Sequence, residues 1–94
     1  MTVLIDSPVW PWRGRRWSHL VSDVSYAELH AFVAAELGIP RRAFQGDHYD
    51  VPEDLYDVAV AAGAQPVECR ELLQRLLAAG LRLRKPRRPA ASAG

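Results

Sequence analysis

Cysteine is almost missing from this chain, because Cys69 is the only one among its 94 residues. A single thiol excludes an internal disulfide and any zinc site built from several cysteines. No histidine is near Cys69 in the sequence, so no cysteine–histidine pair is evident. We therefore expect Cys69 to be a small packing residue in the first turn of the last helix.

Long apolar runs are missing as well. None approaches the ~20 residues that a bilayer-spanning helix needs. The first six residues, Met1-Thr2-Val3-Leu4-Ile5-Asp6, have no basic start followed by a long apolar segment. They are typical of a strand and not of a signal peptide. We expect a cytoplasmic protein without membrane contact.

A strong net charge is the third absence. Twelve basic and eleven acidic residues leave a formal charge of +1, so the domain as a whole is not a basic nucleic-acid binder. The charges are unevenly spread, however. Arg13, Arg15 and Arg16 lie together, five cations lie between residues 82 and 88, and acidic residues concentrate between residues 47 and 71. This asymmetry gives an anion a preferred face to approach.

Familiar catalytic motifs are also lacking. The chain has no glycine-rich phosphate loop, no Walker motif and no Gly-x-Ser-x-Gly elbow. It has no His-x-x-x-His or His-x-His spacing either. These absences exclude the common mononucleotide-binding loops and leave no recognisable setting for a serine or cysteine nucleophile.

Size and composition indicate one small globular domain. With 49% apolar and 24% charged residues, the chain resembles an ordinary folded protein. A domain this short buries one modest core, so a homodimer or an attached domain would add stability. We expect a single α/β domain over residues 1–84 and a disordered, basic, Pro/Ala-rich tail over residues 85–94.

Three helices are predicted from capping patterns and apolar spacing. The first covers residues 26–37, because Ser25 and Glu28 form a capping box and Gly38 follows an apolar stripe. The second covers about residues 51–62, with Asp50 as its cap and Gly63 at its end. The third covers about residues 69–79 and precedes a glycine.

Short strands are predicted between the helices. Residues 2–5 form a buried strand, followed by a loop in which two prolines and a glycine prevent regular structure. Further strands are expected at residues 19–22, 41–45 and 64–67, with an edge strand at Leu81 and Leu83. The alternation favours a small α/β fold with a short, mostly parallel sheet and about three helices. Ligands gather at the carboxyl ends of such strands, where Asp6 lies.

All three histidines precede residue 50, and two of them are near carboxylates. In an extended segment His48 and Asp50 point the same way, so they suit a metal ion or a base with its orienting acid. The alternative for Asp50 is the helix cap. His19 and Asp23 would share a strand face, whereas His30 flanks an apolar helix stripe and is assigned to packing. The candidate catalytic residues are His19, His48 and Asp50, and the candidate metal ligands are Asp6, His19 and His48.

A second candidate site is the segment from Trp10 to Trp17. Guanidinium groups bind phosphate bidentately, and indole rings stack on bases. The alternative is that the tryptophans form a lid over the core. The candidate ligand-binding residues are Arg13, Arg16, Trp17, Gln45 and Tyr49.

Several segments together resemble one small bacterial and phage family, known as domain of unknown function 4031. They are Thr-Val-Leu-Ile-Asp, Trp-Arg-Gly-Arg-Arg-Trp-Ser-His-Leu-Val-Ser-Asp, Glu-Leu-His-Ala-Phe, Phe-Gln-Gly-Asp-His-Tyr-Asp and Ala-Ala-Gly-Ala. The similarity covers about residues 2–79. The family pattern matches at Asp6, His19, Asp23, Gln45, His48, Tyr49 and Asp50. Ser7 departs from it, since relatives often have a second acid there. The resemblance implies a compact domain and supplies no activity.

Three functions fit these observations. The first is binding of a phosphate-bearing ligand, a nucleotide or nucleic acid, through the Arg/Trp loop and the His/Asp cluster. The second is a metal-dependent hydrolase of phosphoesterase or nuclease type, with a divalent metal as cofactor. The third is a non-catalytic protein-interaction module that docks through the tryptophan loop. The residues leave open whether the chain is an enzyme.

Overall fold

A five-stranded mixed sheet forms the centre of the computed structural model, which describes residues 2–82. The strands are β1 (Val3–Ile5), β2 (Trp10–Trp12), β3 (Arg15–Ser22), β4 (Tyr49–Pro52) and β5 (Gln65–Pro66). The central strand β3 pairs antiparallel with β1, β2 and β4, and β5 joins β1 in parallel. The α/β class is confirmed, but the prediction of a mostly parallel sheet is wrong, because only one of the four pairings is parallel.

The antiparallel character comes from a β-hairpin in the segment predicted as an irregular loop. Arg13 and Gly14 both have positive φ angles, 52° and 74°, so they form a tight turn that returns the chain along β2. Pro11 is tolerated because β2 lies at the sheet edge, where a missing N–H costs no ladder bond. The prolines therefore shape this segment without preventing regular structure.

The first and third helices agree with the predicted positions, whereas the second begins later than predicted. The first helix consists of α1 (Tyr26–Phe32) and a π-helical continuation, η1 (Val33–Leu37). The Ser25 side chain accepts a hydrogen bond from the Glu28 backbone, as the capping pattern predicts, whereas the Glu28 carboxylate accepts from Ser22. The other helices are η2 (Arg41–Ala43), η3 (Glu53–Leu55), α2 (Tyr56–Ala61) and α3 (Cys69–Ala78). No helix within residues 2–82 is long and apolar enough to cross a membrane.

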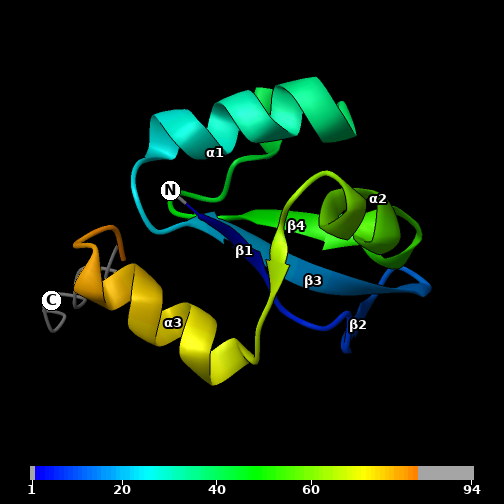
Figure 1. The fold of residues 1–94 in the computed structure, drawn as a ribbon. Coiled ribbons are helices and arrows are strands. Elements are labelled where there is room, and N and C mark those ends of the chain that lie inside the picture. The colour runs from blue at the N-terminus through cyan, green and yellow to red at the C-terminus, as the bar shows by residue number, and fades with distance from the viewer. Residues whose placement is uncertain (1, 83–94) are drawn as a thin grey trace, which may run out of the picture.

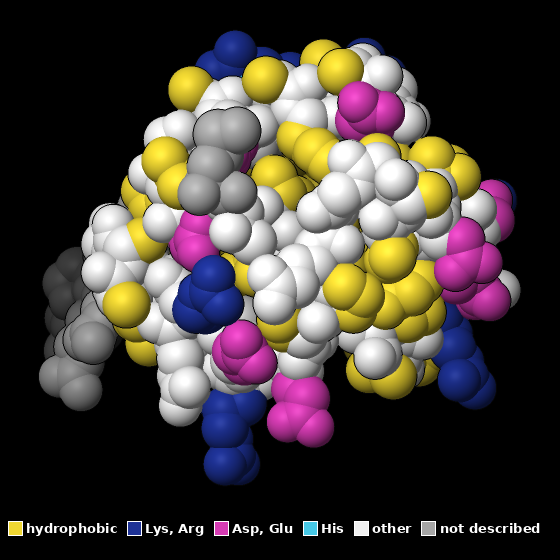
Figure 2. Space-filling model, viewed as in Figure 1, with side chains coloured by type: hydrophobic (Ala, Val, Ile, Leu, Met, Phe, Trp, Pro, Cys, Tyr) yellow, Lys and Arg dark blue, Asp and Glu magenta, His cyan; other side chains and the backbone are white. Residues whose placement is uncertain are grey.

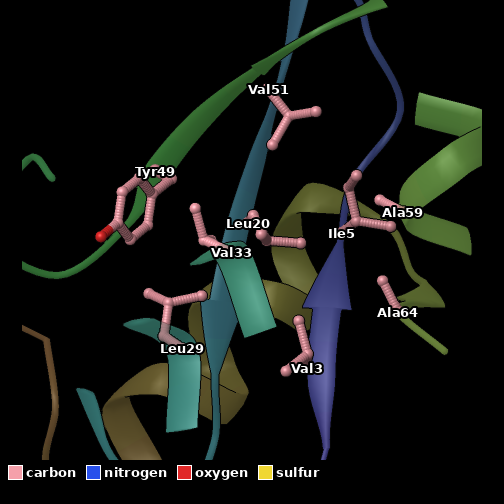
Figure 3. Packing of buried hydrophobic residues seen from close by; sticks show 9 residues of the cluster. All are labelled: Val3, Ile5, Leu20, Leu29, Val33, Tyr49, Val51, Ala59 and Ala64. Atoms are coloured by element: carbon pink, nitrogen blue, oxygen red, sulfur yellow. The ribbon is translucent and has the colours of Figure 1, made fainter. Parts of the chain in front are cut away.

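The helices cover both faces of the sheet, so the domain has three layers (Figure 1). α1 and α2 pack on one face, and α3 packs on the other. The core on the α1 side contains the nine residues drawn in Figure 3: Val3, Ile5, Leu20, Leu29, Val33, Tyr49, Val51, Ala59 and Ala64. A smaller cluster on the α3 side contains Leu4, Val21, Leu72 and Leu76. Alternate strand residues thus face opposite layers.

Two further predictions about local structure are wrong. Residues 41–43 form a 3₁₀ turn and not a strand. Asp50 does not cap the second helix, because it lies within β4, and that helix begins later. Leu81 lies outside the strands, while Leu83 and the predicted tail over residues 85–94 lie outside the described residues.

Candidate functional site

The side chains of β3 and β4 that face α3 bring the candidate residues together. In the register of this antiparallel pair, His19 lies opposite Asp50 and Leu20 lies opposite Tyr49. Leu20 and Tyr49 face the α1 core, so His19 and Asp50 point to the other face. His48 precedes Asp50 by two residues and shares its side. The predicted proximity of His19, His48 and Asp50 is therefore present in the fold.

Asp6 fixes the position of His19. It follows β1 and is 4% exposed. One carboxylate oxygen accepts a hydrogen bond from the backbone N–H of His19 at 2.6 Å, and the other lies 2.7 Å from His19 Nδ1. Because Nδ1 is engaged, Nε2 of His19 remains as the ligand atom. Of the predicted metal ligands Asp6, His19 and His48, the first two lie together, whereas the metal-spaced groups within residues 2–82 place His48 with His19 and Asp50 and not with Asp6.

His48 has a carboxylate on each ring nitrogen. Its Nδ1 is 2.7 Å from Asp47, which is 4% exposed, and its Nε2 is 3.3 Å from Asp50 Oδ1. That Asp50 oxygen is shielded from solvent, and the longer contact lacks good hydrogen-bond geometry. Burial lowers the pKa of His48, but the interactions with Asp50 and Asp47 outweigh it, so the pKa lies above its ordinary value.

Two overlapping groups of side chains have metal-ligand spacing. In the first, His19, His48 and Asp50 each offer one ligand atom, and these atoms all lie within 4.8 Å of one another. In the second, Asp6, His19 and Cys69 meet the same criterion. The rings of His19 and His48 are 5.3 Å apart, edge to face. His19 is common to both groups.

The tryptophan hairpin adjoins this cluster. The Trp10 ring stacks on His19 at 6.0 Å, and Trp17 stacks on Trp10 at 6.5 Å. Trp17 also donates a hydrogen bond to the backbone oxygen of Trp12. Trp12 is 47% exposed and carries the Arg13 guanidinium 4.5 Å above its ring. The three indole rings contact one another, and Trp10 joins this cluster to His19.

One arginine of the hairpin, Arg15, is less available to an anion than the sequence suggests, because an aspartate pairs with its guanidinium. Arg15 lies 3.4 Å from Asp54, and the backbone N–H of Arg16 donates to Glu53. On the face seen in Figure 2, basic and acidic side chains are interspersed, and hydrophobic side chains gather on the side where α2 and β2 lie in Figure 1. A role of Arg13, Arg16 and Trp17 in ligand binding stays a prediction.

Of the two other predicted ligand-binding residues, Tyr49 does not face the cluster. Tyr49 is 1% exposed on the opposite side of the sheet, where its hydroxyl contacts His30 Nδ1 at 2.7 Å. Gln45 is tied through its backbone N–H to the His48 carbonyl. His30 packs against Phe44 and Tyr49, as predicted. Asp23 is separate from the cluster, because it binds Arg75 at 2.7 Å.

Two clefts open beside the cluster. One, of about 320 Å³, lies between the sheet and α3 and has His19, His48 and Arg82 among its lining residues. The other, of about 430 Å³, is lined by Asp6, Trp10 and their neighbours. His19 and Cys69 line both clefts. A ligand in either cleft would therefore contact these two side chains.

Cys69 is the residue that sequence reasoning missed. It is exposed, not packed in the core, and its thiol sulfur lies within 4.8 Å of a carboxylate oxygen of Asp6. Burial and the charge of Asp6 raise the pKa of this thiol. A signal was available: the parallel partners β1 and β5 end at the same sheet edge, which places the residues after them, Asp6 and Cys69, close together.

Comparisons with known proteins give a family and no activity. A family model described as "Protein of unknown function (DUF4031)" matches residues 3–79. No curated protein and no solved structure matches the chain.

Proposed function

We propose that this chain, which belongs to the DUF4031 family of unknown function, binds a divalent metal ion through His19, His48 and Asp50 and uses it for hydrolysis. The observation that carries the proposal is that each imidazole has its own buried aspartate on Nδ1. Histidines that bind metals usually have such a carboxylate on the other ring nitrogen, which fixes the tautomer and orients the ring. Asp6 and Asp47 have this relation to the two histidines, both at 2.7 Å.

The surroundings of the Asp50 carboxylate also support a metal site. Its Oδ1 is enclosed by protein and lies 3.3 Å from His48 Nε2 without good hydrogen-bond geometry. A buried carboxylate oxygen that is poorly satisfied costs free energy, and a cation between Asp50 and the imidazoles would remove that cost. Two imidazoles and one carboxylate form a set with room for further ligands, as in catalytic zinc sites.

The chemistry follows from an open coordination position. A divalent ion held here would lower the pKa of a coordinated water and polarise an ester oxygen. The protein would orient both rings through Asp6 and Asp47 and shield the site under α3. Arg82 lines the same cleft as His19 and His48, with its guanidinium 3.6 Å from Asp47. A cation at this place favours an anionic substrate, so we propose a phosphate ester as the substrate class.

Metal binding is tested by titrating chelator-treated, untagged protein with Mn²⁺ in a calorimeter. We expect one ion per chain for the wild type and a loss of at least tenfold in affinity for His48→Ala. His30→Ala is the matched control, because His30 lies on the α1 side of the sheet, away from the cluster. Equal losses in both variants, or no binding by the wild type, would contradict the proposed site.

Hydrolysis is tested with a chromogenic phosphate diester and the metal-loaded protein. Turnover that requires the ion and disappears in His48→Ala would support the reaction. Metal binding without turnover of phosphate mono- or diesters would limit the proposal to the metal site.

A second candidate function is binding of a nucleotide or single-stranded nucleic acid without hydrolysis. It is favoured by the cluster of three tryptophan rings beside His19, in which Trp12 is exposed and has the Arg13 guanidinium above its ring. Bases stack on such rings, and each stack contributes about 1–3 kcal/mol. Tryptophan fluorescence should then be quenched by an oligonucleotide, less so at high salt and less so in Trp12→Ala. If the quenching is the same at high salt and in Trp12→Ala, this result would contradict nucleic-acid binding by the tryptophan hairpin.

A further inference from the structure

The second ligand group, Asp6, His19 and Cys69, differs from the first in containing sulfur. Its three ligand atoms lie within 4.8 Å of one another. Asp6 is buried, His19 is partly buried and Cys69 is exposed, so the group opens to solvent on the Cys69 side. The buried Asp6 carboxylate holds His19 through its contact with Nδ1.

The fold holds these residues on separate rigid elements. Asp6 follows β1, His19 lies within β3, and Cys69 is the first residue of the ten-residue helix α3. The backbone connects them further, because Val67 donates a hydrogen bond to Ile5 and Asp6 donates one to His19. The group is therefore a product of the sheet topology and not of a loose surface loop.

The thiol has no structural role that explains its position. It is exposed, and the chain has no second cysteine with which it could form a disulfide. The thiol is accessible to a ligand, because Cys69 and His19 line both clefts.

We propose that Asp6, His19 and Cys69 form a second metal site that takes thiophilic divalent ions such as Zn²⁺ and Cd²⁺. Thiolate ligands select soft ions, whereas carboxylate and imidazole ligands accept harder ions such as Mn²⁺. The two sites share His19, so occupation of one competes with occupation of the other. A soft ion on the Cys69 side takes the Asp6 carboxylate away from its contact with His19 Nδ1, so His19 loses the orientation that Mn²⁺ binding at the first site needs.

Cadmium is the probe for this site, because a thiolate bound to Cd²⁺ absorbs in the near ultraviolet and the other two ligands do not. We expect the wild type to show this band with one Cd²⁺ per chain. Cys69→Ser should abolish the band, and His19→Asn should weaken Cd²⁺ binding at least tenfold. His48→Ala should keep the band, because His48 belongs only to the first group. Thermal unfolding of each variant verifies that it is folded.

The results separate this proposal from the proposed function. Mn²⁺ binding should be lost in His48→Ala and kept in Cys69→Ser, which is the opposite pattern to Cd²⁺. Absence of the Cd²⁺ band in the wild type would overturn the second site. A band that survives unchanged in His19→Asn would also overturn it, since Cys69 would then bind Cd²⁺ without the group. Loss of the band in His48→Ala would show one site with four ligands instead of two competing sites.

Discussion

Replacing Asp6 by asparagine should weaken metal binding while leaving the fold in place. In the wild type the Asp6 carboxylate accepts from the His19 backbone at 2.6 Å and contacts His19 Nδ1 at 2.7 Å. The Asp6→Asn side chain keeps one oxygen for the backbone N–H. Its amide NH₂ then faces Nδ1, which must accept, so the proton moves to Nε2. The imidazole is left in the wrong tautomer for binding the ion through Nε2.

The size of the effect follows from the contacts. Loss of a carboxylate behind a metal-binding histidine typically costs 10–100-fold in affinity, or about 1.4–2.7 kcal/mol. Asp6→Ala differs because it removes both acceptors. The buried backbone N–H of His19 then has no partner, which costs about 1–3 kcal/mol. That is a large part of the ~5–14 kcal/mol expected for a domain of this length.

Two measurements distinguish these effects: calorimetric titration with Mn²⁺ and unfolding in urea. Asp6→Asn should lose affinity with little change in stability, whereas Asp6→Ala should lose both. Asp23→Asn is the matched control, since Asp23 also accepts from a backbone N–H and pairs with a cation, Arg75, but contacts no histidine. Unchanged Mn²⁺ affinity in Asp6→Asn would refute the role of Asp6 in orienting His19.

Three other predictions concern the metal-free protein. Because the pKa of His48 is raised, its protonated form stabilises the fold below the ordinary pKa of about 6.5, and this contribution is lost as the pH rises through the higher folded-state pKa. NMR titration should show the raised pKa, and urea unfolding at stepped pH should show the loss of stability. A measured pKa at or below the ordinary value would contradict this prediction. Tyr49→Phe should lower the free energy of unfolding by about 1 kcal/mol, because it removes one buried hydrogen bond; no change would show that this bond adds nothing. Leu76→Ala should cost about 2–5 kcal/mol and Leu77→Ala under about 1 kcal/mol, since Leu76 is buried and Leu77 is 48% exposed; similar losses by chemical denaturation would mean that α3 packs differently.

The parts of the fold that depend on residues close together in the chain could be predicted from the sequence. The first helix is recognisable because Ser25 caps it locally and Gly38 ends it with a φ of 67°. The hairpin was missed because two prolines counted against a strand, although an edge strand tolerates them. The sheet direction was missed for the same reason, since the hairpin makes β3 antiparallel to β1.

The site was predictable only in part. His48 and Asp50 share a face because of strand alternation, which acts over two residues. Their position opposite His19 depends on the register of β3 and β4, about 30 residues apart in the chain. Asp50 was a plausible helix cap because a local pattern fitted it, but pairing in the sheet outweighed that pattern. Cys69 reaches Asp6 only through the parallel pairing of β1 and β5, which no local signal encodes.

The central position of β3 has a consequence for motion. This strand pairs with three others, and it carries His19 in its middle. Its backbone amides should therefore be among the slowest in the domain to exchange with deuterium, because they open only when the whole sheet unfolds. An imidazole mounted on such a strand is held ready before any ligand arrives, so recognition here would proceed by lock-and-key docking and not by loop closure.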